Sequence, residues 1–394
     1  MKISLNKWSA LHLMRWLRAD RVQAHVLSRR TDLVTPDPSP LQRWGKSCFA
    51  ESQGMLGRLP GQTLYVAVPS ADARLQSSHV VNTVYGWGIP AGSFIEVDDG
   101  IAISGPELLF VEMAALMHPI EHLMLGHELC GTFGRSAADP RNGKVSFALP
   151  PLTSVERIGR FLESARGIRG ICQARSTLAR LSDNAWSPTE SLIASFLSAG
   201  IDDMGFGFDS LQMNERVPRA AELPGAKESR VPDILVGGTK VGLNYDGLAH
   251  LDLESIARAA MAMGTNPGAL HAERELKAAV RAVRSKVLDD AHRNRELTAG
   301  GYTVFPVFKE DLYQPGGLDS LVSRLVEVLE QQGGLDLRVP KRALASKALG
   351  EDRYRLLRSL LPGRYEPQAE LGRYIAGVRL AEGEPEVVEC WIEL

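Results

Sequence analysis

The segment from Arg230 to Gly247 constrains the fold of this chain more than any other stretch. Two short apolar runs flank a Gly-Gly-Thr turn, and this pattern predicts a β-hairpin. Asp233 stands near the start of the first strand and Asp246 at the end of the second. Pairing of the strands would bring both carboxylates to one end of the sheet, within reach of one divalent metal ion. The alternative is that Asp233 only enters the strand after Pro232, and that Asp246 belongs to an ordinary turn.

Length and composition limit the number of domains, the kinds of partner and the cellular location that we expect for this chain. A chain of 394 residues is long for a single core and favours two or three domains. A net charge of -2 gives no overall attraction to nucleic acids or membranes, so any polyanion site has to be a local patch. The four cysteines form no Cys-x-x-Cys pair, which disfavours a zinc site or a disulfide framework and predicts a cytoplasmic location. No apolar run reaches the roughly 20 residues of a membrane span, and charged residues interrupt any signal-peptide pattern.

Residues 1–150 are predicted to form a smaller α+β domain. Helical periodicity predicts a helix from Met1 to about Arg30 and another from Trp44 to Leu56. Short apolar runs between residues 62 and 103 then predict an antiparallel meander. Ser104 and Glu107 have the spacing of a capping box, which predicts a helix that Ser104 caps.

A second motif, His118-Pro119-Ile120-Glu121-His122, matches the H-x-x-E-H pattern of one class of zinc proteases. That chemistry needs both histidines on one continuous helix. Because Pro119 disfavours helix before it, we expect Pro119 to begin a new helix with His118 outside. The pattern therefore predicts a joint between two helices with surface histidines, and no zinc site.

Residues 151–185 are predicted to form a basic helical linker, helical from Thr153 to Leu181. Its arginines greatly outnumber its acids; three of them are candidate nucleic-acid contacts, namely Arg157, Arg160 and Arg169. Two interpretations stay open for this segment. It is either a solvated face between domains or a face that contacts phosphates.

Residues 186–335 are predicted to form a compact α/β unit. Ser187, Pro188 and Glu190 have the pattern of a helix start with a capping box. A strand between Gly205 and Val217, the hairpin, a long helix from His271 to Ala299, a strand at residues 302–308 and a closing helix follow in that order. Residues 336–394 are predicted to form an extension in which a basic helical stretch precedes a terminal hairpin.

This order of elements resembles the restriction-endonuclease-like (PD-(D/E)XK) nucleases, and within them the very-short-patch-repair-like endonuclease-domain proteins of bacteria. The resemblance covers about residues 186–332. Five pieces carry it: the helix start at 187–190, Val231-Pro232-Asp233, Leu243-Asn244-Tyr245-Asp246-Gly247 with His250, Asp290-x-x-Arg293-Asn294, and Gly301-Tyr302-x-Val304. It implies a mixed sheet flanked by helices, preceded here by the smaller α+β domain.

The resemblance also implies a site and a chemistry. Glu190, Asp233 and Asp246 match the acids that hold one or two Mg²⁺ or Mn²⁺ ions, and His250 matches the histidine that follows Asp-Gly. Such ions activate a water molecule for attack on a DNA phosphodiester. Arg293 matches a position that contacts phosphate or braces the sheet.

Asn244 departs from this pattern, because relatives usually have glutamate there. Asparagine is an uncharged ligand, so a hard-cation site should bind Mg²⁺ more weakly and activate water less well. Glu190 has a structural role as well, as the partner in the capping box.

Three hypotheses follow from these residues. The chain is a metal-dependent DNA endonuclease impaired by Asn244, or a catalytically inactive nuclease-fold module that binds DNA or regulates a bacterial defence or toxin–antitoxin system. The third is a structural module that contacts proteins alone.

The N-terminal half also resembles the antitoxin proteins of type IV abortive-infection systems, through the Ile103-Ser104-Gly105-Pro106-Glu107 helix start after the strands. Candidate partners are therefore DNA, a partner protein or a second copy of the chain, and no membrane.

Overall fold

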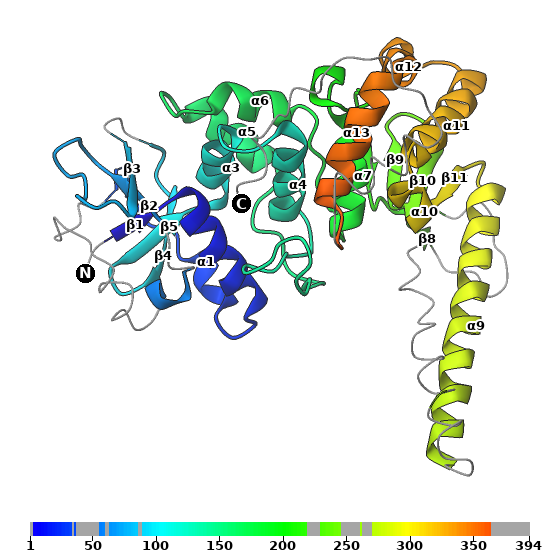
Figure 1. The fold of residues 1–394 in the computed structure, drawn as a ribbon, viewed down its shortest axis with the longest axis horizontal. Helices are drawn as coiled ribbons and strands as arrows, with labels where there is room; N and C mark the ends of the chain where they lie inside the picture. The colour runs from blue at the N-terminus through cyan, green and yellow to red at the C-terminus, as the bar shows by residue number, and fades with distance from the viewer. Residues whose placement is uncertain are drawn as a thin grey trace, which may run out of the picture.

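The computed structural model describes residues 3–33, 35–36, 55–59, 63–85, 89–218, 229–245, 261 and 270–363. It is an α/β structure in which helices pack around and between two mixed sheets (Figure 1). The strands are β1 (Ile3–Leu5), β2 (Leu64–Val68), β3 (Val80–Val84), β4 (Phe94–Asp98), β5 (Ile101–Ser104), β6 (Leu211–Met213), β7 (Val217–Pro218), β8 (Ser229–Arg230), β9 (Ile234–Val236), β10 (Val241–Tyr245) and β11 (Thr303–Val307). The helices are α1 (Lys7–Ala19), α3 (Pro106–Ala114), α4 (Pro119–Cys130), α5 (Val155–Ser164), α6 (Ile171–Leu178), α7 (Pro188–Ser198), α9 (Leu270–Ala299), α10 (Lys309–Tyr313), α11 (Gly317–Gln332), α12 (Arg338–Ala345) and α13 (Lys347–Leu360), with short 3₁₀ turns η1 (Ala24–Ser28), η2 (Leu56–Arg58) and η3 (Ile201–Asp203).

The N-terminal sheet has the order β3-β2-β1-β5-β4. Its central strand, β1, runs parallel to β5 and antiparallel to β2, and β2 runs parallel to β3. The prediction of a continuous helix to about Arg30 and of an antiparallel meander was therefore wrong. β1 has only three residues, which are too few to show the periodicity of a strand. The helical pattern of α1 begins almost directly after them. The predicted helix from Trp44 to Leu56 lies almost wholly outside the described residues.

The helix start after β5 differs from the prediction by one residue. The N-cap of α3 is Gly105, and Pro106 takes the first helical position, which suits its fixed φ and missing N–H. Ser104 is instead the last residue of β5, and its hydroxyl donates to the Glu112 carboxylate at 3.0 Å. Glu107 forms an ion pair with Arg30, with Nη1 and Oε2 2.6 Å apart. The predicted cap residues therefore join α3 to its neighbours.

The H-x-x-E-H motif begins α4 as the proline predicts. His118 is the N-cap, its Nδ1 accepts from the Ile120 N–H at 3.2 Å, and the Glu121 carboxylate accepts from the His118 N–H at 3.2 Å. The prediction of surface histidines was wrong, since His122 and His127 are 0% and 1% exposed. The His122 ring stacks on Phe110 with centroids 4.2 Å apart. Both histidine rings are part of the core because partners distant in sequence cover them.

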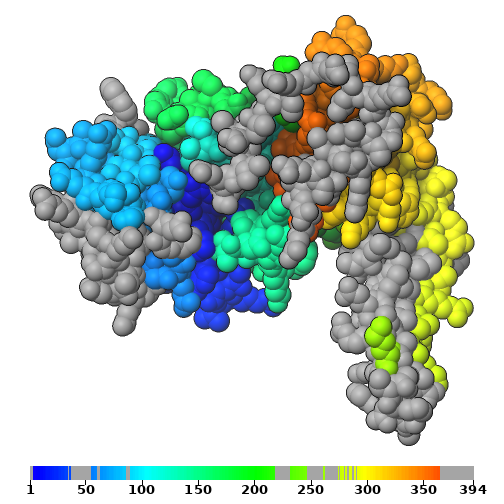
Figure 2. Space-filling view, in the orientation of Figure 1, coloured from blue at the N-terminus to red at the C-terminus, as the bar shows by residue number. Residues whose placement is uncertain are grey.

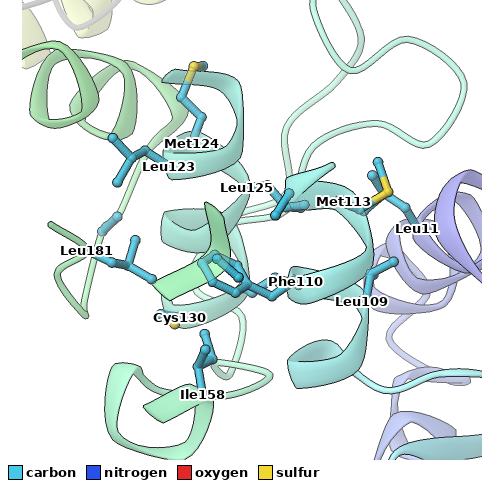
Figure 3. Packing of buried hydrophobic residues seen from close by; sticks show 14 of the residues in the cluster. Leu11, Leu109, Phe110, Met113, Leu123, Met124, Leu125, Cys130, Ile158 and Leu181 are labelled. Carbon is cyan, nitrogen blue, oxygen red and sulfur yellow. The ribbon is translucent and has the colours of Figure 1, made fainter. Parts of the chain in front are cut away.

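The basic segment after residue 150 forms two helices, α5 and α6, which pack on α3 and α4. Figure 3 shows Ile158 of α5 and Leu181 pointing toward Phe110 and Cys130. Gly170, with φ of 96°, separates the helices, and a Cβ there would stand 2.5 Å from the Val111 carbonyl oxygen. The segment forms two helices because the chain must turn closely against α3.

The C-terminal sheet has the order β11-β10-β9-β6. β6 and β9, and β9 and β10, pair antiparallel, whereas β10 and β11 are parallel. The predicted hairpin is confirmed as β9 and β10, and the predicted order of helix, strand, hairpin, long helix, strand and helix is confirmed as well. β6 is shorter than expected. The helices α11, α12 and α13 pack together beside this sheet (Figure 1).

α9 is 30 residues long, which corresponds to about 45 Å. Figure 2 shows it extending away from the body of the molecule. Its C-terminus has the hydrogen bonds of a Schellman motif, from the Tyr302 N–H to the Leu297 carbonyl and from the Gly301 N–H to the Thr298 carbonyl, both 2.9 Å. Gly301 has φ of 79°, as this motif requires. Among the described residues, no helix combines the length and the apolar character needed to cross a membrane.

Candidate functional site

Asp233 and Asn244 face each other across the β9–β10 hairpin. The strands pair Leu243 with Ile234, so the next residue on β10 lies opposite the residue that precedes β9. The Asn244 side-chain carbonyl accepts the backbone N–H of Asp233 at 3.0 Å. In return, the Asp233 carboxylate accepts the backbone N–H of Tyr245 at 2.6 Å. The two side chains therefore hold the open end of the hairpin together.

Asn244 is 2% exposed, and its side chain is oriented by this bond. Its Nδ2 is buried and has no hydrogen-bond partner within the described part of the chain. An amide offers one acceptor oxygen and two donor hydrogens, whereas an ionised glutamate would offer acceptors alone. Asn244 thus accepts a hydrogen bond from the Asp233 backbone N–H, and it provides no negative charge that would attract a cation.

Glu190 is held at the start of α7 by hydrogen bonds. Its carboxylate accepts from the Trp186 N–H at 3.0 Å and from Asn214 Nδ2 at 2.7 Å, while Ser187 Oγ accepts from the Glu190 N–H at 3.2 Å. The predicted helix start is therefore confirmed. Burial raises the pKa of Glu190, and the bond from Asn214 opposes that rise.

Asn214 connects Glu190 to the hairpin. Its side chain donates to Glu190, and its backbone N–H donates to the Asp233 carbonyl at 3.0 Å. The structure thus brings Glu190, Asp233 and Asn244 to one end of the sheet. Asp246 and His250 lie outside the described residues, so their predicted place beside Asp233 stays a prediction.

The described residues fit a Mg²⁺ or Mn²⁺ site poorly on their own. Such ions prefer several carboxylate oxygens. Glu190 accepts two hydrogen bonds through its carboxylate, and the Asn244 carbonyl accepts one. Within the described ranges, no three His, Cys, Asp or Glu side chains are grouped as a metal site requires.

The predicted basic residues lie in three separate places. Arg157 and Arg160 belong to α5, where Arg157 Nη2 is 3.4 Å from Glu107 Oε1 and Arg160 Nη2 is 3.7 Å from Glu156 Oε1. Arg169 is exposed and lines a cavity in the N-terminal half of the chain. Arg293 is half-buried near the C-terminal end of α9. These arginines therefore do not surround the hairpin as one patch.

A basic stripe on α9 was not among the predicted nucleic-acid contacts. We use this name for four exposed residues spaced three, four and three apart, namely Arg274, Lys277, Arg281 and Arg284. Residues at these spacings share one face of a helix. The spacing of these residues is visible in the sequence. Their exposure is not, because it arises from the way α9 extends away from the body of the molecule.

Comparisons with protein-family models, with curated proteins and with solved structures found no match to this chain.

Proposed function

We propose that the C-terminal unit is a restriction-endonuclease-like module that binds DNA and whose metal site is impaired or lost. The observation that carries the proposal is the arrangement of α7, β6, β9, β10, α9 and β11, with Asp233 at the start of the hairpin. That arrangement agrees with the order of elements and the acid position that the family resemblance implies. Such a module would act in the cytoplasm, and a regulatory role in a bacterial defence or toxin–antitoxin system accords with it.

The basic stripe of α9 supports the DNA-binding part of the proposal. Binding to a duplex depends largely on cationic side chains that neutralise phosphates. The net charge of the chain is -2, so the attraction has to come from such a local surface. Arg281 and Arg284 stand on the exposed face of a helix that extends from the module (Figure 2).

The hydrogen bonds of Asn244 and Glu190 support the impaired site. Both side chains hold local backbone groups, and a metal ion would have to compete for the same oxygens. Asn244 removes one negative charge from the set that the family resemblance implies. A site with fewer charges binds a hard cation less strongly and lowers the pKa of its water less.

The second candidate function is metal-dependent hydrolysis of DNA phosphodiesters. The location of Asp233 supports this candidate, since Asp233 directly precedes β9 and Asn214 connects its backbone carbonyl to the Glu190 carboxylate. In this case Asp233, Asp246 and Glu190 would hold Mg²⁺ or Mn²⁺, with His250 beside them. Both candidate functions require DNA binding, and they differ in whether the bound DNA is cleaved.

One experiment separates them. The full chain is incubated with plasmid and with single-stranded DNA in Mg²⁺ or Mn²⁺, and binding of a labelled duplex is measured at low and high salt. Asp233→Asn keeps an acceptor for the Tyr245 N–H and removes the charge, and Asn244→Glu restores the glutamate of the relatives. Circular dichroism confirms that each variant is folded.

Salt-sensitive binding without cleavage supports the impaired module, and cleavage gained in Asn244→Glu would strengthen it further. Cleavage by the natural chain that Asp233→Asn abolishes supports the nuclease. Absence of DNA binding at low salt would overturn both candidates, because both depend on contact with phosphates.

A further inference from the structure

The N-terminal half of the chain contains a cavity of about 260 Å³ that the proposed function does not use. It opens between the start of α1, the end of β3, the end of α3 and the turn that precedes α6. Its charged lining consists of Lys7, Arg166, Arg169 and Glu112. Three cations and one anion therefore meet in a small volume.

Glu112 forms the base of this site. It is 2% exposed, and its carboxylate accepts from the Tyr85 hydroxyl, from Ser104 Oγ at 3.0 Å and from the Lys7 N–H at 3.1 Å. Burial raises the pKa of Glu112, and these three donors oppose that rise. The network positions the start of α1, because it binds the backbone of Lys7.

Lys7 has an unusual backbone conformation for a residue with a side chain. Its φ is 48°, in the left-handed region that such residues rarely adopt. Strain of this kind persists where the surroundings enforce it, and it is concentrated at functional sites. Here the Glu112 carboxylate holds the Lys7 N–H, and the Lys7 side chain lines the cavity.

The other two cations come from one turn. Arg166 Nη1 donates to the Glu163 and Ala165 carbonyls at 2.7 and 3.0 Å, which fixes the position of its guanidinium group. Arg169 is exposed at the cavity. Burial lowers the pKa of Lys7, the charge of Glu112 opposes that effect, and the charge of Arg169 adds a smaller lowering. Repulsion between these cations would be relieved by a bound anion.

We propose that this cavity binds a phosphomonoester group. With an ionised Glu112, the four charged residues sum to +2, which complements the charge of about -1.5 to -2 that a phosphomonoester carries near neutral pH. Lysine and arginine are the side chains that bind phosphate most often, arginine through its planar set of donors. The cavity lies just below the range of about 300–1,000 Å³ found for drug-sized ligands. It therefore fits a small phosphorylated compound or the phosphate at a nucleic-acid end.

Thr83 adds a neutral donor to the site. It lines the cavity, and its Oγ1 is buried without a hydrogen-bond partner among the described residues. A hydroxyl group can donate to a phosphate oxygen or accept from a ligand hydroxyl. This buried group would gain a partner on binding, which favours a ligand that fills the cavity.

Titration calorimetry and thermal unfolding of the full chain test the proposal. The probes are inorganic phosphate, adenosine monophosphate, and matched oligonucleotides with a 5′-phosphate or a 5′-hydroxyl. Lys7→Met and Arg169→Gln each remove one charge from the cavity. Arg21→Gln is the matched control, because Arg21 is exposed beyond the opposite end of α1.

We expect at least one phosphate probe to bind and to raise the melting temperature. Each cavity variant should weaken that binding by on the order of tenfold or more, as loss of a charged hydrogen bond does, and Arg21→Gln should leave it unchanged. A preference for the 5′-phosphate oligonucleotide that disappears in Arg169→Gln would assign the phosphate to a nucleic-acid end, whereas binding of the free nucleotide alone would assign it to a small metabolite. Absence of binding by all probes, or equal binding by all variants, would overturn the proposal whatever the C-terminal module does.

Discussion

Arg15 and Glu128 form a buried bidentate ion pair that joins α1 to α4. Arg15 Nε and Nη2 donate to the two Glu128 carboxylate oxygens at 3.0 and 2.7 Å, and the side chains are 8% and 3% exposed. Burial alone would raise the pKa of Glu128, but Arg15 and Arg135 outweigh it and lower that pKa to about 2. The contact between the N-terminal sheet domain and the helices that follow it thus depends on charge as well as on apolar packing.

Replacing Arg15 by methionine should destabilise the protein. The Glu128 carboxylate would remain buried with Arg135 alone, whose Nε is 3.8 Å from Oε2. We expect a loss of about 3 kcal/mol in the free energy of unfolding, measured by urea denaturation. Arg21→Met, at an exposed position, is the control, and equal stability of the two variants would contradict the role assigned to Arg15.

His122 and His127 should make the stability depend on pH. Burial lowers the pKa of each to about 4, below the ordinary 6.5. Between these values the unfolded chain binds protons that the folded chain does not bind, so the stabilisation is complete above about pH 6.5 and is lost as the pH falls toward 4. The maximum slope is about 1.4 kcal/mol per pH unit for each histidine.

Urea denaturation at about pH 7, 6 and 5 measures that slope. His122→Gln and His127→Gln should each reduce it. His292→Gln, on the exposed face of α9, should leave it as it is. An unchanged slope in the variants of both buried histidines would show that other groups cause the acid sensitivity.

Asn244→Ala should destabilise the β9–β10 hairpin whether or not the chain cleaves DNA. The substitution removes the acceptor of the Asp233 N–H, and an unsatisfied donor of this kind costs about 1–3 kcal/mol. Gln212→Ala, at an exposed position of β6 in the same sheet, is the control and should change stability by less than about 0.5 kcal/mol. Thermal unfolding of the two variants gives the comparison, and equal melting temperatures would refute the structural role of Asn244.

Gly242→Ala should disrupt the same hairpin for a steric reason. A Cβ at Gly242 would stand 2.2 Å from the Ile234 carbonyl oxygen, so the paired strands would have to separate. We expect a loss of about 3 kcal/mol. Gly238, with φ of 75° and open space around it, provides the comparison; its alanine variant should cost about 1 kcal/mol. Similar losses for the two variants would contradict the close approach.

Reversing two charges of the α9 stripe should weaken DNA binding. The variant Arg281→Glu/Arg284→Glu removes two cations, and the slope of log affinity against log salt should fall by about 1 for each phosphate that the helix no longer neutralises. Arg324→Glu, on the exposed side of α11, is the control. Fluorescence anisotropy over a range of salt concentrations gives both slopes, and identical slopes would exclude the stripe as the surface that binds DNA.

Local signals in the sequence were sufficient for much of the C-terminal unit. The glycines of the β9–β10 turn, the Ser187 cap and the glycines after α9 each determine a conformation within a few residues. These elements were therefore predicted in the right order. The hydrogen bond between Asn244 and Asp233 was not predicted, because it depends on the register of two strands.

Interactions between distant residues account for the errors. β1 is three residues long and is a strand because β2 and β5 pair with it on both sides. His122 is buried because the Phe110 carbonyl and the Thr177 hydroxyl lie against its ring nitrogens, at 2.7 and 3.0 Å. None of these partners is visible in the local sequence around β1 or His122, because each lies far away along the chain.

The central position of β1 also determines when the N-terminal sheet can form. Ser4 pairs with Ala67 and with Ala102, so β1 acquires its second neighbour only after about a hundred further residues have been synthesised. At the usual rate of about 5–20 residues per second, this interval lasts on the order of 5–20 s. During that interval the apolar side chains of β1 and α1 have to be kept from other contacts, so synthesis of this half of the protein should depend on chaperones more than that of the locally paired β9–β10 hairpin.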